Sequence, residues 1–333
     1  MKSPAPARKS GSRPYPVAGL DDSLAELRQF RDDTRRKAKT ISLVILAAGI
    51  LLSIAQFVAD GQLPFVYAVL GAIIAVTLYS GMMRGVRSKY KEIVLPSILK
   101  GIDPGLSYNP RGYIPKEEFR RSKIFSKSAD SYTGEDLVFG SYRGIPIRFS
   151  ELKVQEEHRD DKDNTTYETF FEGVFMIADF NKDFKYSHWV LPDTAEAAFG
   201  QLFGNFLQKM SSSRRGHMTR LEDPLFEKRF VVYTEDDVEA RYILSPKLMR
   251  AMLTLSDHFR RGTSKIGFAF MNSNVYVAIP TEGNFFEMPS YGDLGSETAR
   301  KTQDELKEIL SVFDVMELDL RLWSKDRPYS LRR

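Results

Sequence analysis

The chain has 333 residues, a formal net charge of +4, and 42% hydrophobic and 28% charged residues, which is the composition of a folded protein. It contains no cysteine, so disulfide bonds, thiolate metal sites and thiol catalysis are excluded. Much of the excess positive charge flanks two apolar runs, which favours attraction to anionic lipid over nucleic-acid binding.

The first residues precede any apolar pattern. Residues 1–20 are rich in Pro, Ser, Gly and basic residues, which predicts a disordered basic leader. Beyond it, Leu24, Leu27 and Phe30 recur at helical spacing, so we expect a juxtamembrane helix that leads into the first apolar run. The apolar stripe of this helix has three candidate partners: lipid, another protein, or this protein's own domain.

Two uncharged apolar runs follow, at residues 41–58 and 64–83. At about 1.5 Å per residue, helices over these runs would be about 27 and 30 Å long, which matches a hydrocarbon core of about 30 Å. Neither run has the polar face of a globular helix, and the first lies too far from the start for a signal peptide. The runs therefore predict a hairpin of two transmembrane helices.

The charges beside the runs predict their orientation. The linker between the runs contains no Lys or Arg, so the positive-inside rule places both termini in the cytoplasm and predicts a multi-pass plasma-membrane protein. The basic residues on the other side of the runs are Arg35, Arg36, Lys37, Lys39, Arg84, Arg87, Lys89 and Lys91.

After the second run, a juxtamembrane helix is expected to about residue 100, kinked or ended near Pro96. We expect a cytoplasmic domain at 101–325, with a division into two subdomains near residue 210 left open, and a basic tail at 326–333. A turn-rich segment marks its entry, and a short helix is expected from Pro115.

The domain mixes strand-like and helix-like runs in clusters rather than in alternation, and its first strands have connections too short for crossover helices. The fold class is therefore α+β, with antiparallel sheet and flanking helices behind the transmembrane hairpin. Helices are predicted at 194–210, 246–259 and 297–315. Strands are predicted at 136–142, 145–157, 168–180, 184–191, 217–223, 228–234, 240–244, 265–270, 274–279 and 316–323.

Motifs for known chemistry are mostly missing. The chain has no phosphate loop, no dinucleotide fingerprint, and no zinc-protease or serine-hydrolase signature. The tripeptide at 158–160 matches the kinase His-Arg-Asp, but the other kinase elements are absent. Four histidines, at 158, 188, 217 and 258, show no ligand spacing. We therefore assign no catalytic residue, no cofactor site and no metal site from the sequence.

Carboxylates at strand ends and turns are the remaining candidates for chemistry. Paired carboxylates perform acid–base work when burial separates their pKa values, whereas acidic turn residues are usually solvated. An enzyme would require two or more of Glu135, Asp136, Glu222 and Glu239 to converge in a concave pocket with raised pKa values. The candidates are Glu135, Asp136, Glu222, Asp223, Glu227 and Glu239.

Residues 221–255, together with residues 134–151 and the run FFEGVFMIADF, resemble the DUF3137 family of uncharacterised bacterial membrane proteins. The resemblance extends over roughly residues 20–325. It implies a bacterial inner-membrane protein with a cytoplasmic α+β domain and no assigned activity. It also suggests a LemA-type membrane protein as a partner, and it supplies no catalytic residues.

Three functions are compatible with these features. The favoured one is a membrane-anchored interaction or scaffold module that binds a protein partner or lipid headgroups. The alternative is an enzyme that acts on a membrane-proximal substrate through strand-end carboxylates. An oligomeric pore is the least favoured, because the apolar runs carry no ionisable residue. Its polar lining would be limited to Ser42, Ser53, Gln56, Thr77 and Ser80.

Overall fold

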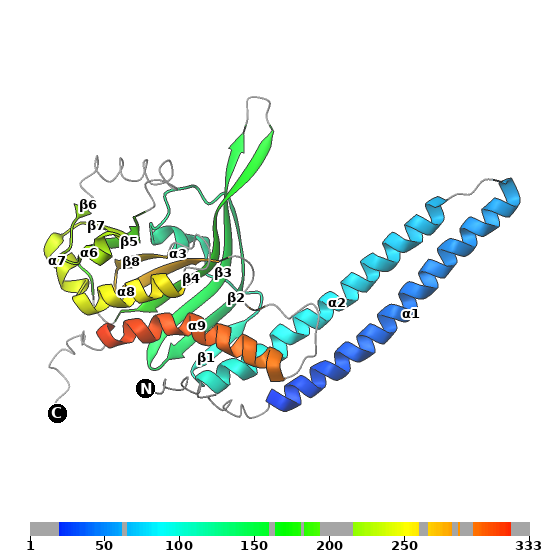
Figure 1. Cartoon of the computed structure of the whole chain (residues 1–333), viewed down its shortest axis with the longest axis horizontal. Helices are drawn as coiled ribbons and strands as arrows, with labels where there is room; N and C mark the ends of the chain where they lie inside the picture. Colours follow the sequence, from blue (N-terminus) through cyan, green and yellow to red (C-terminus); the bar gives the residue numbers. More distant parts are fainter. Residues whose placement is uncertain are drawn as a thin grey trace, which may run out of the picture. The chain divides into compact units, whose positions relative to one another are not determined.

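The computed structural model describes residues 20–61, 65–159, 164–180, 183–193, 216–259, 266–281, 286 and 296–320 (Figure 1). The chain divides into two compact units, Met1–Pro104 with Met288–Gln303, and Gly105–Glu287 with Asp304–Arg333. The leader at 1–19, the helix expected at 194–210 and the basic tail lie outside the described residues.

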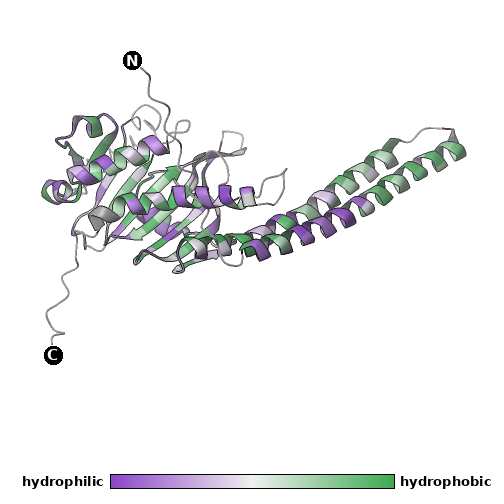
Figure 2. Cartoon of the chain, turned by 60° about the horizontal axis from the view of Figure 1, so that its bottom comes forward, coloured by the Kyte–Doolittle hydropathy of each residue, from purple (hydrophilic) through white to green (hydrophobic). Residues whose placement is uncertain are grey.

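The first unit is built on two long helices, α1 (Leu20–Asp60) and α2 (Phe65–Ile102). Each contains an 18-residue window apolar enough to cross a membrane, with mean hydropathies of 2.5 and 1.9. Only 6% of the first window and 11% of the second are buried. Figure 2 shows the apolar colouring over the C-terminal half of α1 and the N-terminal half of α2. The two predicted apolar helices are therefore confirmed.

The two helices approach closely where Gly49 of α1 faces Gly71 of α2. A Cβ at Gly49 would lie 2.7 Å from the Tyr67 carbonyl oxygen and 3.3 Å from the Gly71 Cα. Nearby, the Ser42 hydroxyl donates to the Ala75 carbonyl across the pair at 3.0 Å. Small residues let apolar helices pack backbone to backbone, and the contact of Gly49 with Gly71 is the point of close approach between α1 and α2.

Replacing Gly49 by Leu should force the helices apart, because the new side chain collides with backbone atoms that cannot rotate away. Overpacking of this kind costs about 1–3 kcal/mol. Since the chain has no cysteine, cysteines placed at Ser42 and Ala75 report the distance by disulfide cross-linking. We expect the cross-linked fraction to fall severalfold with Gly49→Leu and to persist with Gly85→Leu, because a Cβ at Gly85 meets nothing within 4 Å.

The start of α1 packs on α2 within the same unit. Leu24 and Leu27 are fully buried, the Lys89 ammonium lies 3.0 Å from Glu26, and it lies 4.5 Å above the Phe30 ring. The apolar stripe of this segment therefore contacts this protein itself. Lys91 is also buried.

The second unit contains a nine-stranded sheet in the order β1-β2-β3-β4-β9-β8-β5-β7-β6, and all its pairings are antiparallel. This arrangement confirms the α+β class. The strands are β1 (Leu106–Asn109), β2 (Ser131–Tyr142), β3 (Ile145–Arg159), β4 (Thr165–Asp179), β5 (His188–Pro192), β6 (His217–Thr219), β7 (Phe230–Thr234), β8 (Gly267–Met271) and β9 (Asn274–Pro280). The helices are α3 (Lys116–Arg121), α6 (Pro224–Glu227), α7 (Asp237–Ile243), α8 (Pro246–His258) and α9 (Ser296–Leu320), which begins in the first unit.

The two faces of the sheet carry different cores. On one face, Phe119 of α3 packs on Phe175 of β4 with ring centroids 5.0 Å apart, and the Trp189 indole donates to the Ser122 carbonyl at 2.9 Å. On the other face, Phe313 of α9 lies 6.3 Å from Phe149 of β3. Burial of these aromatic side chains stabilises the packing of α3 and α9 on the two faces of the sheet.

Two predicted hairpins are confirmed by their turns. The β2–β3 turn has Arg143 and Gly144 at φ +49° and +86°, and the β8–β9 turn has Asn272 and Ser273 at φ +50° and +66°. Positive φ at both central residues is the geometry that matches the right-handed twist of the flanking strands. The long β3–β4 pair is confirmed as well, with register from Ile147↔Ala178 to Arg159↔Thr165.

Two expected strands are helical instead, and two short elements were not predicted. Residues 240–244 lie in or beside α7, because the Asp236 side chain caps the Glu239 N–H at 2.7 Å and starts a helix there. Residues 316–320 belong to α9, since the buried positions at 306, 309, 313 and 316 continue a helical period that outweighs the short alternation. The helix α6 and the strand β1 were not predicted, and β1 lies in a segment that was expected to be turn. The helix α2 continues through Pro96 and does not end there.

Candidate functional site

A β-bulge in β2 lies beside a polar hollow in the described part of the sheet. Glu135 pairs with Glu151 and Val138 pairs with Phe149, so β2 has one more residue than β3 between these two pairs. Within the bulge, Asp136 has φ +62°. A bulge of this kind bends a strand and redirects side chains. Here it places Asp136 beside the directly opposed pair Glu135 and Glu151.

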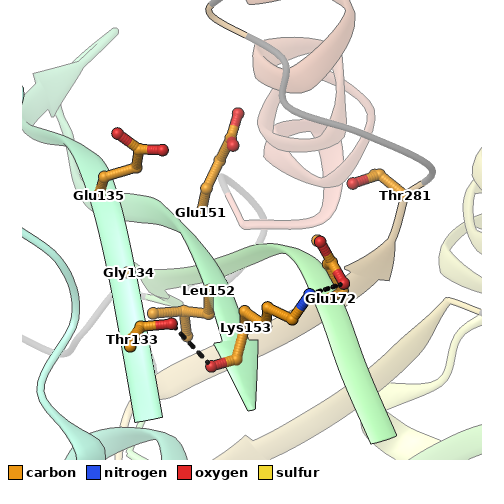
Figure 3. A pocket seen from close by; sticks show the side chains of 9 residues that line it. Thr133, Gly134, Glu135, Glu151, Leu152, Lys153, Glu172 and Thr281 are labelled. Carbon is orange, nitrogen blue, oxygen red and sulfur yellow. Dashed lines mark hydrogen bonds and ion pairs between the residues drawn. The ribbon is translucent and has the colours of Figure 1, made fainter. Parts of the chain in front are cut away.

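The hollow has a volume of about 310 Å³ and lies over β2, β3 and the start of the β4–β9 pairing. Because side chains alternate along a strand, Glu151 and Lys153 share the sheet face of Phe149. Figure 3 shows Glu135 and Glu151 at one side of the hollow, with Lys153 and Glu172 at the other. The lining is Thr133, Gly134, Glu135, Glu151, Leu152, Lys153, Glu172, Gly173 and Thr281.

Three carboxylates converge on this hollow. Each of Glu135, Asp136 and Glu151 offers an oxygen within 4.8 Å of the others. Asp136 is fully buried and Glu151 is 8% exposed, while the Lys153 ammonium is paired with Glu172 at 3.0 Å. Like charges opposed across strands repel each other, so the hollow is a region of negative potential.

A tyrosine hydroxyl supports the buried carboxylate. Tyr108 of β1 donates a short hydrogen bond to Asp136 Oδ1. Burial, and next the Asp136 charge, raise the pKa of Tyr108 well above its ordinary value, so the hydroxyl remains a donor at every physiological pH.

The chemistry of the hollow is that of oxygen ligands. Carboxylate oxygens bind hard divalent cations or cationic groups such as amines and guanidinium. Of the residues singled out from the sequence, Glu135 and Asp136 meet here. Glu151 and Glu172 were missed, because only the cross-strand register Glu135↔Glu151 and Lys153↔Glu172 brings them to the same place.

The other four carboxylates lie elsewhere. Asp223 caps α6 by accepting the N–H groups of Leu225 and Phe226, and Glu227 accepts the Leu221 N–H at 2.7 Å. Glu222 is exposed. The hydrogen bonds of Asp223 and Glu227 stabilise the backbone around α6.

Glu239 belongs to a buried polar network around His188 of β5. Its carboxylate accepts the N–H groups of Lys185 and Tyr186 and lies 3.0 Å from His188 Nε2. On the other side, His188 Nδ1 lies 2.7 Å from the Thr234 hydroxyl. The imidazole is fully buried, and both of its nitrogens have partners.

This network should make stability depend on pH. Burial lowers the pKa of His188 below its ordinary value of 6.5, against the opposing effect of Glu239. The unfolded chain then binds a proton that the folded chain resists, so the free energy of unfolding should fall as pH falls below about 6.5, by at most about 1.4 kcal/mol per unit. We expect His188→Gln to flatten this slope in thermal denaturation and His217→Gln, at an exposed site, to leave it.

Comparison with known proteins finds a match to one family model over part of the chain. Residues 169–318 match the family described as "Protein of unknown function (DUF3137)", which confirms the resemblance over a narrower range than residues 20–325. Among solved structures, the chain is similar to the crystal structure of the mycobacterial trehalose monomycolate transport factor A, TtfA, at 13% identity and a TM-score of 0.30, covering 61% of this chain and 88% of that one. At this identity and TM-score, the similarity gives no information about the function of this chain. The comparison with curated proteins gave no match.

Proposed function

We propose that this chain, whose residues 169–318 belong to the DUF3137 family, is a membrane-anchored interaction module of the bacterial inner membrane. In this proposal α1 and α2 cross the bilayer, both termini lie in the cytoplasm, and the unit that contains the sheet binds a protein partner or lipid headgroups. The resemblance suggests a LemA-type membrane protein as that partner.

The observation that carries the proposal is the exposure of large apolar side chains along both helices. Within 41–58 and 65–78 these side chains are 39–80% exposed, as for Leu43 at 69%, Val58 at 80% and Val66 at 69%. A patch of this size is unusual on a soluble monomer and is the expected surface of a helix in lipid. The 18-residue apolar windows, about 27 Å long at about 1.5 Å per residue, match the hydrocarbon core as well.

Charge supports the orientation. Arg35, Arg36 and Lys37 of α1 and Arg84 and Arg87 of α2 are exposed next to the apolar segments, as the positive-inside rule requires of a cytoplasmic flank. Anchoring confines the sheet-bearing unit to the membrane surface, so partners held in the same membrane meet it at a high effective concentration. Weak contacts then suffice for function.

Fractionation and cross-linking test this proposal in two steps. The intact protein should remain with the membrane pellet after alkaline carbonate, which strips peripheral proteins, and should be released by detergent. In-cell cross-linking should then link the full chain to one membrane protein in repeated experiments. Release by carbonate would refute the anchor, and the absence of any repeated partner would refute the interaction module.

The carboxylate hollow supports a second candidate, an enzyme or receptor for a cationic substrate. Glu135 and Glu151 line the hollow, and Asp136 offers an oxygen within 4.8 Å of both, which supports the concave site that such a function needs. We expect Glu135→Gln to weaken binding of a polyamine or divalent cation by the purified full chain, and Glu222→Gln, at an exposed turn, to have no effect. Equal binding by both variants would remove this candidate.

The pore is not supported by the described polar residues of the helices. The Thr77 and Ser53 hydroxyls donate to carbonyls one turn back in their own helices, at 2.8 and 3.1 Å, and Ser42 donates to α2. Hydroxyls used in this way satisfy the helix pair internally and leave little polar surface for a conducting path.

A further inference from the structure

The β3–β4 pair extends beyond its neighbours in the sheet, as Figure 1 shows. The last β2 partner of β3 is Gln155, and the first β9 partner of β4 is Gly173. Residues 156–159 and 165–168 therefore pair as strands only with each other, in a two-stranded ribbon, while the Ser128 N–H donates to Glu156 Oε1 and Asp130 Oδ2 accepts the Glu157 N–H beside them. Such a ribbon has marginal stability in water, so any interaction between its strands matters for its order.

Glu156 and Glu168 are directly opposite each other in this ribbon, and His158 lies two residues beyond Glu156 on the same face. Opposed like charges destabilise a strand pair. The two carboxylates therefore need a nearby positive charge, and the Lys127 ammonium supplies one.

The side chains point to one another at distances that suit a metal ion. His158 Nε2 lies 3.1 Å from Glu168 Oε2 and 3.5 Å from Glu156 Oε2, and all three ligand atoms lie within 4.8 Å of one another. Ligands bound at about 2.0–2.1 Å with angles between 90° and 109° are about 2.9–3.4 Å apart. The histidine nitrogen therefore stands at nearly the distance from each carboxylate that a shared ion imposes.

A cation is already held at the edge of this cluster. The Lys127 ammonium lies 2.9 Å from Glu168 Oε1 and 3.5 Å from Glu156 Oε2, and its side chain is only 9% exposed. Its closer contact is with Oε1 of Glu168, whereas His158 faces Oε2 of the same carboxylate. Lys127 thus shares Glu156 Oε2 with His158, whose side chain is 50% exposed, and the charge of Lys127 lowers the affinity of the cluster for a second cation.

We propose that Glu156, His158 and Glu168 form a divalent metal site that joins β3 to β4 in the projecting ribbon. One imidazole and two carboxylates suit Zn²⁺, which accepts both ligand types and leaves a fourth position to water. Within the described residues, His158 alone has two carboxylates as ion-pair partners, whereas His217 and His258 each have one. The inference is independent of the membrane anchor and of the carboxylate hollow.

Zinc titration of the intact protein in detergent, after removal of metals by a chelator, tests the site. Calorimetry with ZnCl₂ should show one ion bound per chain, and His158→Ala should weaken that binding roughly tenfold or more. The matched control His217→Ala removes an exposed histidine with one carboxylate and should leave the affinity unchanged. Co²⁺ in place of Zn²⁺ should give visible absorption bands that His158→Ala abolishes.

Lys127→Met supplies a test in the opposite direction. Removing the ammonium while keeping a side chain of similar length should tighten zinc binding severalfold, because one competing charge is lost. A purely structural cluster would show neither effect. Absence of stoichiometric zinc binding in the unsubstituted protein, or equal affinities of the His158→Ala and His217→Ala proteins, would overturn the proposal.

Discussion

Replacing Leu51 and Ile73 together by arginine should remove the protein from the membrane. Leu51 is 65% and Ile73 57% exposed, and both lie near the middle of the apolar segments of α1 and α2. An arginine at the centre of a spanning helix costs about 2.5–3.5 kcal/mol, so the pair should cost about 5–7 kcal/mol of insertion. We expect the variant to be degraded or found in the soluble fraction, as measured by immunoblotting of separated membranes.

The matched control places the same change on exposed apolar side chains of the other unit. Leu225 is 68% and Val238 77% exposed, so Leu225→Arg with Val238→Arg adds equal charge at sites in contact with water. This control should remain in the membrane at normal abundance. If α1 and α2 were instead helices exposed to water, arginine at Leu51 and Ile73 would be harmless, and membrane retention of that variant would contradict the anchor.

Replacing Gly173 by alanine should strongly destabilise the sheet. Gly173 lies in β4 at φ +152°, where a Cβ would lie 2.2 Å from the Ile279 carbonyl oxygen and 2.8 Å from the Thr281 nitrogen. Both colliding atoms are backbone, so no side-chain rotation relieves the contact. Backbone strain and overpacking each cost about 1–3 kcal/mol, and together they should remove about 3–5 kcal/mol of stability.

Gly144→Ala separates strain from collision. Gly144 also has positive φ, +86°, but a Cβ there meets nothing within 4 Å. Its alanine variant should lose about 1 kcal/mol, the cost of a strained dihedral alone. Thermal denaturation followed by near-ultraviolet circular dichroism measures both losses, and equal melting temperatures for the two variants would show that the β4–β9 contact is looser than described.

Local signals in the sequence were sufficient for much of the fold. Apolar length predicted α1 and α2, and two-residue turns such as Arg143–Gly144 predicted hairpins, because these features depend on neighbouring residues alone. The segment at 240–244 was misassigned because five apolar-rich residues fit either period. The Asp236 cap, three residues before Glu239, was the available signal for a helix.

The sites were harder to predict because they depend on register. Glu135 and Asp136 were noted as strand-end carboxylates, but Glu151 joins them only through the β2–β3 pairing and the bulge. In the same way, Glu156 and Glu168 become neighbours only when β3 and β4 pair across a turn whose tip lies outside the described residues. Sequence spacing along one strand carries no information about such pairs.

The description of the protein as a membrane-anchored module depends on α1 and α2 crossing the bilayer with both ends on the cytoplasmic side. Alkaline phosphatase is active only outside the cytoplasm, whereas green fluorescent protein exported in unfolded form is dark. Inserted after Gly61, between the helices, the phosphatase should be active, and fused after Arg333 the fluorescent protein should be bright. An active phosphatase after Arg333, or an inactive one after Gly61, would contradict this topology.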